Sequence, residues 1–159
     1  MNETAAHLST TINRALPLLR GFTESKASTP LAYGKWSPKE IIGHLIDSAG
    51  NNQQKFIRSM EEDGVHFPNY QQDFWVKSQH YNDEPWDLLL LLWEHINLHL
   101  AHIVRNIPPY SLAHTITIGN SGSFILEFIA KDYVEHLKHH LKTLFPDADF
   151  LANSFKMIY

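Results

Sequence analysis

The chain has 159 residues, of which 43% are hydrophobic and 19% charged, and this is typical of one globular domain with a single core. It contains no cysteine, which excludes disulfides, zinc–thiolate sites and a cysteine nucleophile. Its net charge of −4 argues against nucleic acid or an anionic membrane as a partner. Eleven histidines are the compositional anomaly, and histidine and carboxylate are the ligands left for a soft metal. We expect a single cytoplasmic domain over residues 1–159, because a secretion signal and an apolar run of about 18 residues are both absent.

Two helices are predicted in the first half of the chain. Apolar residues at helical spacing predict the first over residues 3–22, where Pro17 should cause a kink or a break. The second begins with the sequence SPKE at residues 37–40. A serine N-cap, a proline in the first turn and a glutamate three residues after the cap together form a capping box. This helix should run to about residue 62 and end near Gly64.

The connection that follows, HFPNYQQDFWVKSQHYNDEP at residues 66–85, has no regular period and is rich in aromatic and amide side chains. A connection of this length inside a compact domain is usually functional or forms a partly helical lid. Its rings and amides could cover a ligand in a pocket. The candidate pocket residues are Tyr70, Gln72, Asp73, Trp75 and Tyr81. A lid that only packs over the open end of the bundle is the competing interpretation.

Two further helices complete the predicted fold. The third covers residues 85–107, carries a leucine run and stops at a Pro-Pro pair. The fourth follows the Ser-Gly-Ser sequence at residues 121–123 and extends to about Phe145. Strand signals are confined to the sequence HTITIG. Four amphipathic helices predict an all-α fold, an antiparallel four-helix bundle with a long, partly helical connection between the second and third helices.

The fourth predicted helix contains the histidine-rich sequence EHLKHHL at residues 135–141. On a helical wheel, His136 and His140 fall inside the apolar arc and His139 falls on its edge. Charged side chains fill the opposite side, namely Glu127, Lys131, Glu135, Lys138 and Lys142. Two histidines four residues apart lie one turn apart, so both rings can reach one ion. Alternatively, each is a core residue whose ring is satisfied by a hydroxyl or carbonyl on a neighbouring helix.

A third metal ligand could come from either of two helices. On the second helix, His44 lies about 60° outside the apolar arc, within a polar cluster that suits a pocket wall or a solvated face. Its polar neighbours are Asp47, Ser48 and Asn51, and the first and last of these could hydrogen-bond a ligand ring or a metal-bound water. On the third helix, the candidates are His95, His99 and His102. His99 lies closest to the apolar stripe, and periodicity does not choose between it and His44.

Three segments together resemble the DinB-like superfamily of four-helix-bundle proteins, whose members include bacillithiol transferases and which is related to the maleylpyruvate isomerases. They are WSPKEIIGHLIDSAGNN on the second helix, YQQDFWV in the connection and EHLKHHL on the fourth helix. The likeness extends from about Trp36 to Leu144. One departure is that many members carry Arg-Gly-Gln after the last histidine, where this chain has Leu-Lys-Thr at residues 141–143.

The resemblance implies a metal site of three histidines, one from the second helix and two, four apart, from the fourth. Carried over by position, these are His44, His136 and His140. His99 would then be a pocket residue or a neighbour of the ligands. His139 would orient a ring or meet the substrate.

Such a site implies a zinc or nickel ion with an open coordination position. With a bound low-molecular-weight thiol as cosubstrate, the protein would be a metal-dependent thiol S-transferase acting on electrophilic small molecules, as the resemblance implies. The alternatives are a metal-dependent hydrolase, and a non-catalytic metal- or ligand-binding stress protein. No single residue is predicted as the catalytic group. A homodimer is expected, because exposed helical faces of bundles often pair about a two-fold axis.

Overall fold

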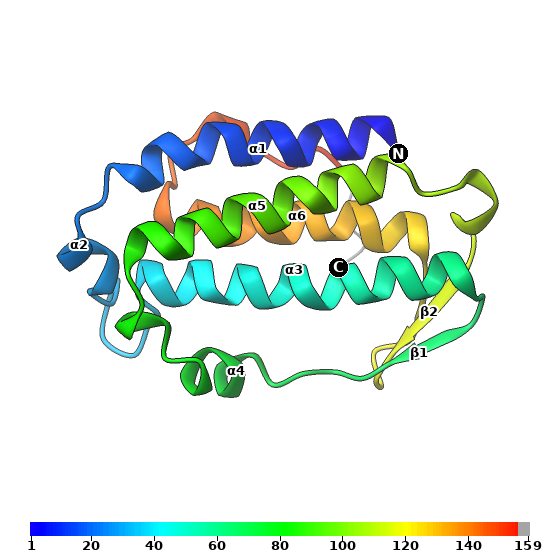
Figure 1. Cartoon of the computed structure of the whole chain (residues 1–159), viewed down its shortest axis with the longest axis horizontal. Helices are drawn as coiled ribbons and strands as arrows, with labels where there is room; N and C mark the ends of the chain where they lie inside the picture. The colour runs from blue at the N-terminus through cyan, green and yellow to red at the C-terminus, as the bar shows by residue number, and fades with distance from the viewer. Residues whose placement is uncertain (156–159) are drawn as a thin grey trace.

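The computed structural model describes residues 1–155, and four long helices make up most of it. They are α1 (Asn2–Arg20), α3 (Pro38–Glu61), α5 (Trp86–Arg105) and α6 (Leu126–Leu144). Figure 1 shows the four helices packed side by side, with the short α2 (Glu24–Ser28) at the end where α1 leads into α3. The all-α four-helix bundle predicted from the sequence is therefore confirmed.

The helices α3 and α5 run in the same direction in Figure 1, and α1 and α6 run in the opposite direction. Two hydrogen bonds between the ends of these helices agree with these directions. The indole N–H of Trp86, at the start of α5, donates to the carbonyl of Leu19 near the end of α1 (3.1 Å). The ammonium of Lys39, at the start of α3, donates to the carbonyl of Asn82 just before α5 (3.1 Å). Because α3 and α5 are parallel, their connection has to return along the bundle, and this accounts for its length.

This return path is partly helical, as predicted. It contains α4 (Gln72–Ser78) and a 3-10 turn, η1 (Tyr81–Asp83). Figure 1 shows α4 lying alongside α3, outside the four-helix core. The connection therefore covers α3 for much of its length.

A small three-stranded sheet lies at the other end of α3 and was only partly predicted. Its strands are β1 (Val65–Phe67), β2 (Thr115–Ile118) and β3 (Ser123–Ile125), in the order β1-β2-β3. β1 pairs in parallel with β2, Val65 opposite Ile116, and β3 pairs with β2 in the antiparallel sense. β2 matches the sequence HTITIG. β1 and β3 were missed because each has only three residues and depends on non-local pairing, and β3 also delays the start of the fourth helix to Leu126.

The predicted start of α3 is confirmed in atomic detail. The hydroxyl of Ser37 accepts the backbone N–H of Glu40 (3.2 Å), and the Glu40 carboxylate accepts the backbone N–H of Ser37 (2.8 Å). This reciprocal pair fixes the register of α3. In α1, the helix continues through Pro17 to Arg20, so the expected interruption does not break it. Pro17 is exposed close to the C-terminal end, where the loss of one backbone hydrogen bond is tolerated.

Two of the charged residues that the wheel placed opposite the apolar arc of α6 are buried. Glu135 is 5% exposed and Lys138 is 2% exposed. The segment after α6 folds back over them through the 3-10 turn η3 (Asp149–Leu151). The Glu135 carboxylate accepts the backbone N–H groups of Ser154 (3.0 Å) and Phe155 (3.3 Å), and the Lys138 ammonium donates to the carbonyl of Ala152 (3.2 Å). The C-terminal segment therefore covers the part of the outer face of α6 that carries Glu135 and Lys138.

Within residues 1–155, no helix is long and apolar enough to cross a membrane.

A further 3-10 turn, η2 (Pro109–Ser111), lies between α5 and β2. Several leucines of α5 are exposed, namely Leu88, Leu91 and Leu92. The homodimer expected from the sequence stays a prediction.

The close approach of Tyr81 to α3 gives a test of the packing. A Cβ placed on Gly43 would overlap the Tyr81 ring, whereas a Cβ on Gly50, in the same helix, meets nothing within 4 Å. We expect Gly50→Ala to raise the free energy of unfolding by up to about 1 kcal/mol, because Ala is the better helix former. Gly43→Ala should lower it by about 1–3 kcal/mol, because the ring is forced out of place. Urea denaturation of both variants measures the two effects, and equal shifts would contradict the packing described.

Candidate metal centre

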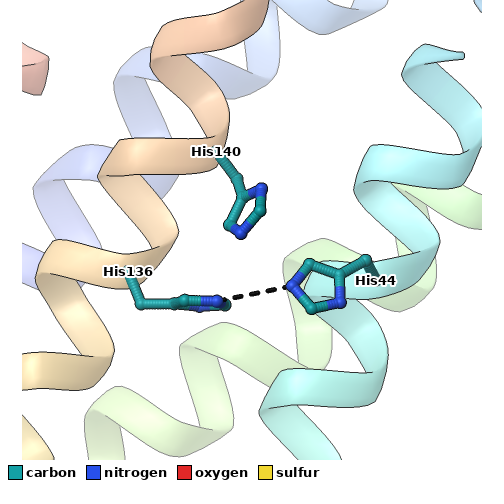
Figure 2. Close-up of side chains that lie close together, drawn as sticks. All are labelled: His44, His136 and His140. Carbon is teal, nitrogen blue, oxygen red and sulfur yellow. Dashed lines mark hydrogen bonds between the residues drawn. The ribbon is translucent and has the colours of Figure 1, made fainter. Parts of the chain in front are cut away.

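Three imidazole rings converge between α3 and α6. His44 comes from α3, and His136 and His140 come from successive turns of α6 (Figure 2). One donor nitrogen from each ring lies within 4.8 Å of the other two. The Nε2 atoms of His44 and His136 are 3.3 Å apart, and the ring centroids of His136 and His140 are separated by 4.6 Å.

The spacing of one pair of these nitrogens matches that of two ligands of a single metal ion. Two nitrogen ligands that bind a tetrahedral zinc at about 2.0–2.1 Å lie about 3.3–3.4 Å from one another. The separation between His44 Nε2 and His136 Nε2 is 3.3 Å. Among residues 1–155, this is the group of histidine and carboxylate side chains with a geometry suited to a metal. The donor set is therefore three nitrogens, with no carboxylate among them.

The helix directions explain how residues 92 positions apart meet. α3 begins at a capping box, so the register of His44 in its second turn is fixed. α6 runs antiparallel to α3 (Figure 1), and this places the last turns of α6 opposite the first turns of α3. His136 and His140 are four apart and share one helical face. Both sides of the centre thus come from regular helices, which hold side chains more rigidly than loops do.

Burial keeps the three rings neutral at physiological pH. His44 is 1% exposed, and His136 and His140 are half-buried. Burial lowers the pKa of His44 to about 4, against an opposing contribution from the charge of Asp73. The pKa of His136 falls to about 3 through burial and then through the charge of His140, and burial lowers the pKa of His140 to about 4. Neutral imidazole is the form that binds a metal.

The rings are held by a hydroxyl and an indole that sequence reasoning did not assign to them. Ser48 Oγ lies 3.4 Å from His136 Nδ1, so it can orient the ring from the side away from His44. The Trp36 ring lies 5.1 Å from that of His44 and 6.5 Å from that of His140. The sequence feature that could have identified Ser48 as a neighbour of the rings is its position one turn after His44, on the same face of α3.

Asp47 and Asn51 do not hydrogen-bond a ligand ring here, although the sequence predicted that they could. The Asp47 carboxylate accepts the Tyr81 hydroxyl (2.7 Å) and the Gln79 amide (2.6 Å). Burial raises its pKa, and these two hydrogen bonds oppose that shift. The Asn51 amide donates to the carbonyl of Asp47 (2.9 Å). Asp47 therefore anchors the returning connection to α3.

Two cavities adjoin the three histidines. An apolar cavity of about 450 Å³ is lined by Leu31, Gly34, Lys35, Trp36, Ile41, Asp73, His140 and Thr143. A polar cavity of about 260 Å³ is lined by His44, Ser48, Asn52, Lys55, Tyr70, Gln72, Ile118, Ile129, Asp132, Tyr133 and His136. Of the connection residues predicted to face a pocket, Gln72, Asp73 and Tyr70 line these two cavities. Trp75 packs against the Tyr70 ring (5.0 Å) and lines a separate hollow with Asp47.

The two remaining predicted pocket histidines are exposed. His139 lies on the outer side of α6, with its ring edge-on to His140 at 5.3 Å. His99 lies on the outer face of α5 and stacks on His102 at 6.4 Å. The prediction that His99 lies beside the centre is therefore wrong, because α5 turns its histidine flank toward solvent. The structure brings together His44 and not His99 with the pair on α6, and their role as ligands stays a prediction.

Comparisons with known proteins place this arrangement in a family. The model of the DinB superfamily matches residues 7–144. A "putative metal-dependent hydrolase" of Bacillus mycoides strain KBAB4 is 21% identical over 128 residues, which are 80% of this chain and 73% of that protein. Another of the same description, from Oceanobacillus iheyensis, is 27% identical over 108 residues, which are 68% of this chain and 62% of its own length.

A solved structure shares the fold. YfiT from Bacillus subtilis, described as "a probable metal-dependent hydrolase with an unusual four-helix bundle topology", superposes with a TM-score of 0.81 at 19% identity. The match covers 91% of this chain and 83% of YfiT. At this identity the likeness concerns the fold alone.

The lowered pKa values predict how the stability of the metal-free protein depends on pH. The unfolded chain takes up protons on histidine near pH 6.5, whereas the folded centre does so only near pH 3–4. The free energy of unfolding should therefore be constant above about pH 6.5 and fall as the pH decreases, by on the order of 1 kcal/mol per buried histidine by about pH 5. Urea denaturation of chelator-treated protein measures this. The slope should be smaller for His136→Gln and unchanged for His99→Gln, and equal slopes in all three proteins would contradict the prediction.

Proposed function

The chain belongs to the DinB superfamily, and we propose that it is a metal-dependent hydrolase of small molecules. The observation that carries this proposal is the convergence of three neutral imidazole nitrogens within 4.8 Å at the meeting point of two cavities. Its relatives in Bacillus mycoides and Oceanobacillus iheyensis are described as metal-dependent hydrolases. That description supports hydrolysis over the thiol transfer favoured by the sequence alone.

We propose His44, His136 and His140 as ligands of a divalent ion, zinc or nickel. Held by these three histidines, the ion would supply Lewis-acid chemistry that makes water a better nucleophile near neutral pH. Because burial keeps all three rings unprotonated, protons compete little with the ion at pH 7. Ser48 keeps the His136 ring turned toward the other two.

The Asp73 carboxylate is the proposed proton acceptor. It lines the apolar cavity together with His140, and its charge reaches His44, whose pKa it raises against the effect of burial. An ionised carboxylate at this position can take a proton from the attacking water and return it to the leaving group. Trp36 closes one side of the same cavity against the His44 and His140 rings.

A thiol S-transferase is the second candidate. The chain has no cysteine, so the attacking sulfur would come from a low-molecular-weight thiol cosubstrate. The apolar cavity of about 450 Å³ is large enough to hold a small ligand beside the centre. The two candidates share the metal ligands and differ in the nucleophile, so one set of variants tests both.

The metal itself is the first test. Purified protein should contain one divalent ion per chain, measured by elemental analysis after removal of any affinity tag. His44→Ala and His136→Ala should each lose most of the ion, because two histidines alone bind it weakly. The matched control is His99→Ala, which removes an exposed histidine of α5 and should keep full occupancy. Metal-free protein with all three histidines intact would overturn the proposal.

Activity separates hydrolysis from transfer. Metal-loaded protein should hydrolyse members of a panel of amides and esters without any added thiol. Asp73→Asn should lower kcat by about 10²–10⁴-fold if the carboxylate is the proton acceptor, with metal content unchanged. Consumption of a thiol by a model electrophile, with no hydrolysis of the panel, would favour the transferase instead. Loss of metal from Asp73→Asn would show that this carboxylate is a ligand and not the proton acceptor.

A further inference from the structure

The two cavities reach the three-histidine centre at different rings and differ in chemistry. The apolar cavity meets the centre at His140, and the polar cavity meets it at His44 and His136. A substrate with its reacting bond at the centre would therefore place one part in each cavity. The chemistry of the two linings then limits what those parts can be.

The apolar cavity suits a flat or branched hydrocarbon group. Its walls include Leu31, Trp36 and Ile41. The Trp36 indole lies nearly parallel to the His140 ring, at 27° and 6.5 Å, and so presents a planar aromatic surface beside the centre. Leu31 is 48% exposed, so burying it against a ligand removes apolar surface from water. An aromatic ring that slides along Trp36 is the group that this wall fits best.

The polar cavity carries a half-buried cation. Lys55, on α3, lines it together with Asn52 and Gln72. Burial lowers the pKa of the Lys55 ammonium, and the charge of Asp132 on α6 opposes that shift and helps to keep the ammonium protonated. Lys55 is also close enough to act electrostatically on His136. A partly dehydrated ammonium gains from an anionic ligand, and because Asp132 lines the same cavity, the ligand carboxylate has to lie nearer to Lys55 than to Asp132.

The other donors of this cavity are suited to the same anion. Burial raises the pKa of Tyr70 to about 12, so its hydroxyl keeps its proton and can donate. The Asn52 amide already donates to the carbonyl and the hydroxyl of Ser48, and the Gln72 amide adds one further donor group. A carboxylate can accept from Lys55, Tyr70 and Gln72 at once, whereas a neutral amide offers a single oxygen.

We propose that the substrate is an amide or ester that joins an apolar, preferably aromatic, acyl group to a leaving group with a carboxylate. The acyl group lies against Trp36, and the carboxylate lies at Lys55. Hydrolysis adds one water: its hydroxyl goes to the acyl carbon and its proton to the leaving nitrogen or oxygen as the carbon–nitrogen or carbon–oxygen bond breaks. The products are an apolar carboxylic acid and an amine or alcohol that carries the second carboxylate. This inference rests on the proposed hydrolase activity.

Three matched probes test the substrate class. N-benzoylglycine has both features, N-benzoylglycinamide lacks the carboxylate, and N-acetylglycine lacks the aromatic ring. We expect kcat/KM to be at least about tenfold higher for N-benzoylglycine than for either of the others, since one charge-assisted contact and the burial of one aromatic ring are each typically worth that factor. Lys55→Met should remove the advantage over N-benzoylglycinamide, mainly through KM, and should leave metal content unchanged. Lys142→Met, which removes an exposed lysine of α6 outside both cavities, should keep the full advantage.

A ligand that cannot be hydrolysed separates this inference from the hydrolase proposal. 4-Oxo-4-phenylbutanoate replaces the nitrogen of N-benzoylglycine by carbon, and calorimetry with the metal-loaded and metal-free protein measures its binding. Binding that Lys55→Met weakens about tenfold or more, without hydrolysis of any amide or ester, would support the two-cavity site and overturn the hydrolase. Hydrolysis of all three probes at equal kcat/KM, or binding that Lys55→Met leaves unchanged, would overturn the inference and leave the hydrolase standing. If this ligand does not bind and N-benzoylglycine is not hydrolysed, the inference is overturned.

Discussion

The antiparallel packing of α3 against α6 is the constraint on which the rest of the structure depends. It brings His44 within reach of His136 and His140, and it buries the His44 ring fully and the other two rings in part. A buried polar ring is costly unless it finds a partner. Among the described residues, His44 Nδ1 is buried without a hydrogen-bond partner, whereas Ser48 Oγ lies 3.4 Å from His136 Nδ1. The stability of this packing therefore depends on the rings keeping their neutral form.

The parallel direction of α3 and α5 determines the path of the connection between them. Because α5 starts at the same end as α3, the chain must travel back along α3 before α5 begins. Asp47 holds this return path by accepting from Tyr81 and Gln79, and Gly43 leaves room for the Tyr81 ring. The same path carries α4, from which Gln72 and Asp73 reach the two cavities. The parallel arrangement of α3 and α5 thus supplies residues of the two cavities that the four long helices do not provide.

The features that were predicted correctly from the sequence are those that a local pattern of residues determines. The capping box at Ser37 set the start of α3, and the wheel separated His136 and His140 from His139. It did not choose between His44 and His99, because both lie beside an apolar stripe and only the packing of helices decides which one faces α6. It also placed Glu135 opposite the core, where a C-terminal segment without helical period covers it. The three-residue strands and the segment after α6 are held in place by contacts with residues distant in the sequence. Such elements show little periodic pattern in their own residues.

The number of protein donors distinguishes a reactive centre from a structural one. A structural zinc is normally held by four protein ligands, and its site is then closed. Among residues 1–155 three donors converge here, and each of the two cavities is lined by at least one of the three rings. His139, one residue before His140, is exposed and does not join the three rings. Asp73 and Trp36 line the apolar cavity beside His140, and space for a ligand next to the three rings is what the proposed reactive centre requires and a purely structural ion does not.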